Sequence, residues 1–164
     1  MQEEPRETVA HYRGSMLMNI RITMDQSVVA LDDLARLYTE SDFGFYEDLV
    51  KDSAVIKIFG GGATGFFAID MDSGKLLGAA RVLSDNIITS YIAEICVLPM
   101  YRGTGLAEKL LEAVTTRFNH TAIFTCGFVG MERFLKTQGL SEKPKLFACS
   151  RRPHFKRLHE FPLN

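Results

Sequence analysis

The chain has 164 residues, of which 46% are hydrophobic and 24% are charged, and its formal net charge is −1. This length and composition predict one globular domain with a substantial hydrophobic core and exclude an intrinsically disordered chain. The charge balance argues against nucleic acid as a main partner, and no apolar run approaches the roughly 20 residues of a membrane-spanning helix.

The N-terminus and the cysteines both indicate the cellular compartment. Residues 1–17 are polar and acidic, without the basic and apolar parts of a signal peptide, and we expect them to form a loose extension of a cytoplasmic protein. Three cysteines stand singly, with no CxxC spacing: Cys96, Cys126 and Cys149. That pattern favours buried free thiols over disulfides or a zinc site, so we expect no metal.

The first half of the chain predicts helices and then a meander of strands. Residues 19–25 read as a strand, 28–38 have apolar residues at helical spacing, and 46–54 form a second helical piece. Strand-like runs flank "GGGATG", residues 60–65, and two more strands follow at 75–85 and 90–98. The Asp, Ser and Gly of "DMDSGK" between them are typical of a hairpin turn.

The "GGGATG" segment contains the GxGxxG spacing of dinucleotide sites. Such a site needs the glycines to open a helix, whereas Gly65 leads into a strand. We therefore predict a flexible hairpin loop and not a nucleotide site.

The second half of the chain alternates strands and helices. Beyond residue 105, one helix face is apolar and the other charged: Leu106, Leu110, Leu111, Val114 and Phe118 against Glu108, Lys109, Glu112 and Arg117. A strand at 121–128, a short helix at 130–139 ended by Gly139, and a last strand at 145–151 follow. This order predicts an α+β protein with a mixed sheet in one domain, residues 18–151, before a basic C-terminal tail, residues 152–164.

The stretch "ICVLPMYRGTGLAEKLLEAV", residues 95–114, turns a strand into a helix through Arg102, Gly103 and Gly105. A helix N-terminus has about four unpaired N–H groups and a partial positive charge. The glycines remove the Cβ atoms that would keep an anion away, and Arg102 adds a fixed charge. These features favour a phosphate or pyrophosphate site, and a tight turn with no ligand is the alternative. The spacing fits neither a Walker A loop nor a Rossmann turn.

This stretch resembles the acetyl-CoA-binding motif of the GNAT superfamily of N-acetyltransferases, Gln/Arg-x-x-Gly-x-Gly/Ala. Arg102, Gly105 and Ala107 match the motif. The resemblance covers roughly residues 20–150, with weaker flanks at "LLGAARVLSDNIITSYIAEICV" and "FLKTQGL". It looks most like small bacterial members and the plastid enzymes that acetylate arylalkylamines and lysines.

The resemblance implies the GNAT fold, a central mixed, mostly antiparallel sheet flanked by helices and splayed between its fourth and fifth strands. The pantetheine of the co-substrate acetyl-CoA would lie in that gap and pair with the backbone of Ile95, Cys96, Val97 and Leu98. The pyrophosphate would bind the N–H groups of Arg102, Gly103, Thr104, Gly105, Leu106 and Ala107. The first two helices of the family usually cover the acceptor, so Phe43, Phe45 and Tyr46 either wall that pocket or belong to the core.

Acetyl transfer to an amine needs a base, because a lysine-like amine with a pKa of about 10.4 costs roughly 4.6 kcal/mol to neutralise at pH 7. Glu94 is the candidate, since it lies in the strand that would flank the thioester and similar enzymes have an acidic residue there. A solvated glutamate is a weak base, so the role requires burial. The alternative is an exposed glutamate or a partner for an arginine such as Arg81.

The usual proton donor is missing. Similar enzymes usually have a tyrosine where this chain has Leu135, and a polar residue where it has Phe128. Water, Cys126 and Tyr91 are the candidate substitutes. A thiolate with a pKa near 8.5 leaves more easily than an alkoxide, so the reaction slows without a donor but need not stop.

The sequence thus predicts an acetyl-CoA-dependent N-acetyltransferase that acts on a small-molecule or protein primary amine through a direct ternary complex. Leu135 and Phe128 motivate the alternative of a non-catalytic acyl-CoA-binding sensor that regulates a partner protein. A toxin whose basic tail reaches aminoacyl-tRNA is a third alternative, against which the near-neutral charge counts. Dimers are common in the family, so we expect a homodimer and no membrane partner.

Overall fold

The computed structural model describes residues 19–41, 58–127 and 130–143. Its elements are β1 (Ile20–Thr23), a 3-10 turn (Gln26–Val28), α1 (Leu31–Glu40), β2 (Ala63–Asp70), β3 (Leu76–Ser84), β4 (Thr89–Val97), a 3-10 turn (Pro99–Tyr101), α3 (Leu106–Arg117), β5 (Ala122–Thr125) and α4 (Glu132–Thr137). Several predictions concern residues outside the described ones: the N-terminal extension, the helix at 46–54 with its aromatic cluster, Phe128, Cys149, the strand at 145–151 and the basic tail.

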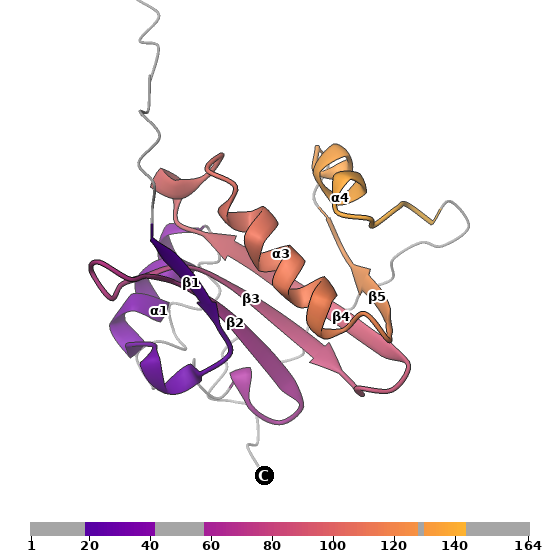
Figure 1. The fold of residues 1–164 in the computed structure, drawn as a ribbon, viewed down its shortest axis with the longest axis horizontal. Coiled ribbons are helices and arrows are strands. Elements are labelled where there is room, and N and C mark those ends of the chain that lie inside the picture. The colour runs from indigo at the N-terminus through magenta and orange to yellow at the C-terminus, as the bar shows by residue number, and fades with distance from the viewer. Residues whose placement is uncertain (1–18, 42–57, 128–129, 144–164) are drawn as a thin grey trace, which may run out of the picture.

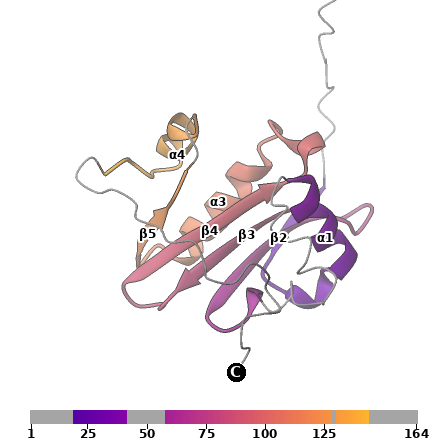
Figure 2. The same cartoon turned by 180° about the vertical axis from the view of Figure 1, so that it is seen from behind.

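The five strands form one sheet in the order β1-β2-β3-β4-β5, antiparallel throughout except for the parallel pair of β4 and β5. This confirms the predicted mixed, mostly antiparallel sheet. Helix α3 covers one face, with α4 beside it above the β5 edge, and α1 covers the other face (Figures 1 and 2). One apolar cluster fills the space under α1 and a second fills the space under α3.

Helix α1 begins three residues later than its apolar spacing predicted. The Asp25 carboxylate accepts a hydrogen bond from the Ser27 amide and fixes a 3-10 turn, after which Val29 and Ala30 are extended. The extended backbone at these two residues ends the turn and delays the helix until Leu31. Leu34, Leu37 and Tyr38 are then buried on the sheet.

The glycine segment at 60–65 leads into a strand, as predicted, and opens no helix. Gly61 and Gly62 have φ angles of +62° and +96°, and the Ala63 amide donates to the Gly60 carbonyl at 3.2 Å, so the chain turns directly into β2. The strand expected before the glycines is not found in the part that is described, where Ile58 and Phe59 form a helical turn.

Helix α3 packs as its sequence predicted. Leu106, Leu110, Leu111, Val114 and Phe118 are at most 1% exposed, and the charged residues face solvent. The helix comes close to the sheet at Gly78, where a Cβ would lie 2.9 Å from the Cys96 carbonyl oxygen and 3.2 Å from Leu110 Cδ1.

Strands β4 and β5 part after only four paired residues. Their pairing runs from Thr89↔Ala122 to Ile92↔Thr125, and β4 then continues to Val97 with no partner from β5. The strand predicted at 121–128 is therefore shorter than expected and ends at Thr125. A bulge near the same point sets Arg81 opposite Glu94 but Val82 opposite Ile92. Among the described residues, the second half of β4 is therefore left with an unpaired edge on this side, as expected for a splayed sheet.

Helix α4 ends as predicted, with Gly139 at a φ of +81° and its amide bonded to the Lys136 carbonyl at 3.1 Å. In the part of the chain that the structure describes, no helix has the length and apolar character needed to cross a bilayer.

Candidate functional site

The turn between β4 and α3 has the backbone that its glycines predicted. After the 3-10 turn at Pro99–Tyr101, Gly103 and Gly105 take left-handed φ angles of +73° and +84°. A Cβ on either glycine would meet no atom within 4 Å. The glycines are therefore needed for the backbone conformation, and the side of the turn that they leave bare is open.

The same turn presents unpaired N–H groups. The first amide to enter the hydrogen bonding of α3 is that of Lys109, which donates to the Gly105 carbonyl at 3.1 Å. Among the described residues, none accepts a hydrogen bond from the N–H groups of residues 103–108. With the positive end of the helix dipole behind them, these groups suit the oxygens of a phosphate or diphosphate.

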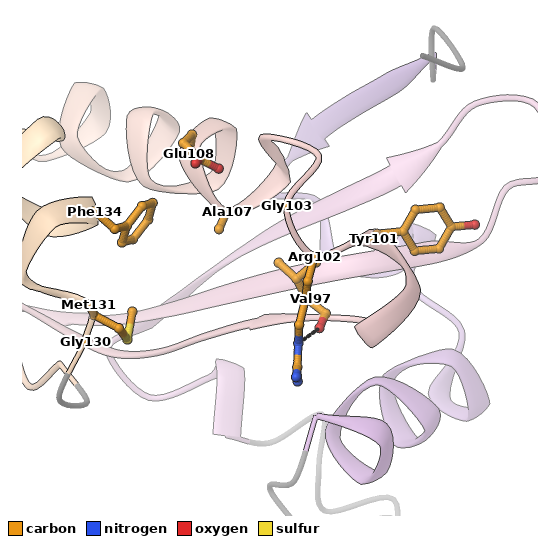
Figure 3. Close-up of a pocket in the computed structure, with 9 residues that line it drawn as sticks. All are labelled: Val97, Tyr101, Arg102, Gly103, Ala107, Glu108, Gly130, Met131 and Phe134. Carbon is orange, nitrogen blue, oxygen red and sulfur yellow. Dashed lines mark hydrogen bonds between the residues drawn. The ribbon is translucent and has the colours of Figure 1, made fainter. Parts of the chain in front are cut away.

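A pocket of about 270 Å³ lies beside this turn, between the end of β4, the start of α3 and α4 (Figure 3). It is lined by Val97, Tyr101, Arg102, Gly103, Ala107, Glu108, Gly130, Met131 and Phe134. The Arg102 side chain lies along the end of β4, and its Nε donates to the Val97 carbonyl at 3.4 Å. Among the described residues, no three His, Cys, Asp or Glu side chains gather as a metal site would require.

The four residues expected to pair with pantetheine divide into two kinds. The Leu98 amide donates to the Leu77 carbonyl at 3.0 Å, whereas the Val97 carbonyl accepts from Arg102 and from the Ser41 hydroxyl, away from β3. Because successive backbone groups of a strand alternate in direction, Cys96 and Leu98 face β3, and Ile95 and Val97 face the opening. Only the latter two have backbone groups directed to a ligand there.

Glu94 is buried and hydrogen-bonded to two side chains. Its Oε1 accepts from Arg81 Nε at 2.6 Å and from the Tyr38 hydroxyl at 2.9 Å, and its Oε2 accepts from Arg81 Nη2 at 2.8 Å. The arginine partner that was the alternative to a base role is thus present, together with the burial that the base role requires. A carboxylate offers about four acceptor positions, so the three bonds from described residues leave one position for a further donor.

Tyr38 is the participant that sequence reasoning missed, because its helical spacing marked it only as a core residue. Cys96 lies close to Glu94 and its two partners. Burial raises the pKa of the Cys96 thiol far above its ordinary value, and the charge of Glu94 raises it further by a smaller amount.

The residues discussed as proton donors or their replacement lie near the point where β4 and β5 part. Tyr91 is paired with Phe124, two residues before Cys126, and Leu135 lies close to Gly127, the residue after Cys126. Cys96 is a buried free thiol as predicted, but the prediction of burial was wrong for Cys126, which is exposed. The reason is that β5 ends at Thr125, one residue before it.

Comparison with known proteins agrees with these features. The model of the Acetyltransferase (GNAT) family matches residues 31–133. No curated protein matches the sequence closely enough to count as a relative.

Solved structures of the same fold include a GNAT family acetyltransferase from Streptococcus pneumoniae, with a TM-score of 0.57, 16% identity, and coverage of 83% of this chain and 100% of that one. Glucosamine-6-phosphate N-acetyltransferase from Arabidopsis thaliana has a TM-score of 0.56, 16% identity, and coverage of 80% and 97%. The aminoglycoside N-acetyltransferase AAC(6')-Iy in complex with CoA has a TM-score of 0.59, 18% identity, and coverage of 87% and 99%. These likenesses confirm the expected fold.

Proposed function

The chain belongs to the GNAT acetyltransferase family, and from that membership we propose that it transfers the acetyl group of acetyl-CoA to a primary amine. Acetyl transfer from acetyl-CoA follows from the family itself. The choice of nitrogen as the acceptor atom, the direct ternary complex and the roles of individual residues are our proposal. Two structures of the same fold are enzymes that acetylate amino groups of sugars, an aminoglycoside and glucosamine 6-phosphate, which guides the choice of acceptors to test.

The observation that carries the proposal is the row of N–H groups at residues 103–108, which have no hydrogen-bond acceptor among the described residues. This row lies next to a pocket and to an edge of β4 that no described strand pairs with. A diphosphate needs several donors in a row, which this turn offers, and Gly103 and Gly105 leave it room. From there the pantetheine would run along β4 and bond to the backbone of Ile95 and Val97. The thioester would then lie near the bulge at Glu94, which is the candidate base.

Glu94 would take the amine proton through a water molecule at its remaining acceptor position. Arg81 and Tyr38 hold the carboxylate in one orientation, so this position is fixed relative to the opening of the sheet. Removal of the proton offsets the cost of presenting a neutral amine at pH 7. We expect Glu94→Gln to lower kcat by about 100-fold or more while leaving the affinity for acetyl-CoA within about twofold of wild type.

The first test is isothermal titration with acetyl-CoA. Ala107→Glu places a carboxylate beside the proposed diphosphate site, and we expect binding to weaken by about 10- to 100-fold. An acidic residue in the first turn also stabilises a helix, so this variant should fold. Thr116→Glu adds the same charge near the far end of α3 and is the matched control, for which binding should be unchanged. Equal affinity in both variants would contradict the diphosphate site.

The second test is release of free thiol across a panel of amino sugars, arylalkylamines, polyamines and lysine peptides, with alcohols of matched structure as the contrast. Release with an amine but not with its alcohol supports N-acetylation. Tight binding without release for any amine would favour the alternative, a sensor that binds acyl-CoA and regulates a partner.

A further inference from the structure

A row of apolar side chains crosses three strands of the sheet. Leu83 of β3 is paired with Tyr91 of β4, and Tyr91 is paired with Phe124 of β5. Leu83 and Phe124 are 43% and 41% exposed, although both are large and apolar. On the basis of the proposed amine acetylation, we infer that this apolar row binds the body of the acceptor. The acceptor is then a small primary amine on an aliphatic or aromatic body, and not a polyamine or an amino sugar.

All three side chains of the apolar row lie on the face of the sheet that α1 partly covers. Their sequence neighbours Val82, Ile92 and Ile123 belong to the cluster under α3 or pack on it, and strand side chains alternate between the two faces. The apolar row is therefore on the side opposite to α3. No described helix lies over this part of the face, because α1 packs at the other end of β3 and β4 (Figure 2).

The apolar row ends beside the candidate base. Arg81 precedes Leu83 by two residues on β3, so their side chains share a face and lie about 7 Å apart along the strand. Arg81 is paired with Glu94 in the sheet, and its side chain donates to the Glu94 carboxylate at 2.6 and 2.8 Å. An amine that Glu94 deprotonates through a water molecule would therefore have its carbon body over Leu83 and Tyr91.

The co-substrate would occupy the other face of the sheet. The pocket beside the proposed diphosphate site is lined by Ala107 of α3 and by Phe134 of α4, and both helices lie on the face away from α1 (Figure 1). The α1 face is thus left to the acceptor. The two substrates would meet at the unpaired edge of β4, as direct transfer in a ternary complex requires.

The charges of this region match an amine with a neutral body. Along the parts of β3, β4 and β5 that carry the apolar row, the charged residues are Arg81, Glu94 and, directly after β3, Asp85. The first two bind each other, and the Asp85 carboxylate accepts from the amides of residues 87–89 at 2.9–3.0 Å. A second cationic group on the acceptor would meet apolar side chains without a counter-charge, whereas each methylene buried there improves affinity by about three- to fourfold.

The kinetic test uses amines that differ at one point. Hexylamine and 1,6-diaminohexane have the same carbon chain, but the diamine carries a second charge at the far end. We expect kcat/KM to be at least about 50-fold higher for hexylamine. From butylamine to octylamine, kcat/KM should rise by about three- to fourfold for each methylene that the row covers.

Variants of the row test whether it is the surface that the carbon chain contacts. Leu83→Thr combined with Phe124→Thr removes apolar area and keeps β-branched residues that suit a strand. We expect this double variant to raise the KM for hexylamine by about tenfold and to remove most of the dependence on chain length, with kcat and the affinity for acetyl-CoA within about twofold of wild type. Met71→Thr is the matched control, because Met71 is also 43% exposed but lies at the other end of β3. It should behave as wild type.

A binding measurement does not depend on turnover. In isothermal titration of the protein saturated with CoA, hexylamine should bind at least about tenfold more tightly than 1,6-diaminohexane. This preference should be lost in the double threonine variant and kept in Met71→Thr.

The possible failures are distinguishable. Acetylation of 1,6-diaminohexane or of an amino sugar as efficient as that of hexylamine would overturn the inference and leave amine acetylation intact. An undiminished dependence on chain length in the double variant would show that another surface binds the acceptor body. Preferential binding of hexylamine without acetylation of any amine would refute the proposed function, and the row would then bind an apolar amine as a ligand and not as an acceptor.

Discussion

At the scale of single residues, the Glu108 carboxylate repels the diphosphate that the neighbouring N–H groups would bind. It lies in the first turn of α3, where a negative charge stabilises the helix, and it also lines the pocket beside the proposed diphosphate site. The same carboxylate therefore contributes to folding and repels a diphosphate. Arg102, on the other side of the pocket, only partly offsets this repulsion because its guanidinium is turned to the Val97 carbonyl.

Neutralising Glu108 should tighten the binding of acetyl-CoA. We expect Glu108→Gln to lower the Kd by about two- to fivefold at low salt, with a smaller gain at high salt because exposed charges are screened. Glu112→Gln, one turn further along the same helix and outside the pocket, is the control and should leave the Kd unchanged. Isothermal titration of both variants with acetyl-CoA at two salt concentrations measures these Kd values. A gain of equal size in both would mean that the effect comes from net charge and not from the site.

A functional residue could be predicted from sequence when its role depends on its immediate neighbours in the chain, and not when it depends on contacts with distant residues. The anion turn was accessible from sequence because Gly103 and Gly105 are required by the backbone of those residues themselves. The partners of Glu94 were only partly accessible, since Arg81 is opposite Glu94 in the sheet but Tyr38 is 56 positions away in another element. The exposure of Cys126 was mispredicted because its apolar neighbours suggested a strand that in fact ends one residue earlier.

At the scale of elements, the Glu94 cluster ties helix α1 to the two central strands. Tyr38 comes from α1, Arg81 from β3 and Glu94 from β4, and the two charged side chains are only 16% and 4% exposed. A charge buried to this degree is stable only while its partner is present. The cluster therefore makes the placement of α1 depend on the register of the β3–β4 pair.

Breaking this ion pair from one side should destabilise the fold more than removing both charges. We expect Arg81→Met to lower the free energy of unfolding by about 3–5 kcal/mol, because Glu94 is left buried without its counter-charge. The double variant Arg81→Met with Glu94→Leu should recover a large part of that loss. Urea unfolding of wild type and the two variants tests this. A double variant less stable than Arg81→Met alone would show that the carboxylate stabilises the fold by another route.

Hydrophobic periodicity and turn residues predicted the existence of the helices and strands more reliably than they predicted where each one begins and ends. The apolar face of α3 and the hairpin turn after β2 were predicted correctly, since each is encoded within a few neighbouring residues. The beginning of α1 and the end of β5 were not, because they are set by the Asp25 turn and by the parting of the sheet. The opening that defines the site could be expected only from the family resemblance.

At the scale of the whole molecule, the sheet separates two apolar clusters, and β4 contributes to both. Ile92 and Val97 pack under α3, whereas Cys96 and Leu98 pack under α1. The strand whose edge is proposed to bind the co-substrate is therefore fixed on both faces. Cys96 is an ionisable group in this arrangement with only 1% exposure, and its titration connects the pH to the stability of the entire fold.

Alkaline pH should destabilise the protein through Cys96. Burial raises the pKa of this thiol well above its ordinary value of 9.0, so the folded state keeps the proton at a pH where the unfolded chain loses it. The stability that the neutral Cys96 thiol contributes is fully present below pH 9 and is lost as the pH rises. We expect the free energy of unfolding to be lower by about 1.4 kcal/mol at pH 10 than at pH 7. Denaturant unfolding at both pH values should show this loss in wild type and in Cys126→Ala, because both keep the buried Cys96 thiol. Cys96→Val should lack it, since valine has no proton to lose. If wild type and Cys96→Val lose stability in parallel, the thiol is not the group that couples folding to pH.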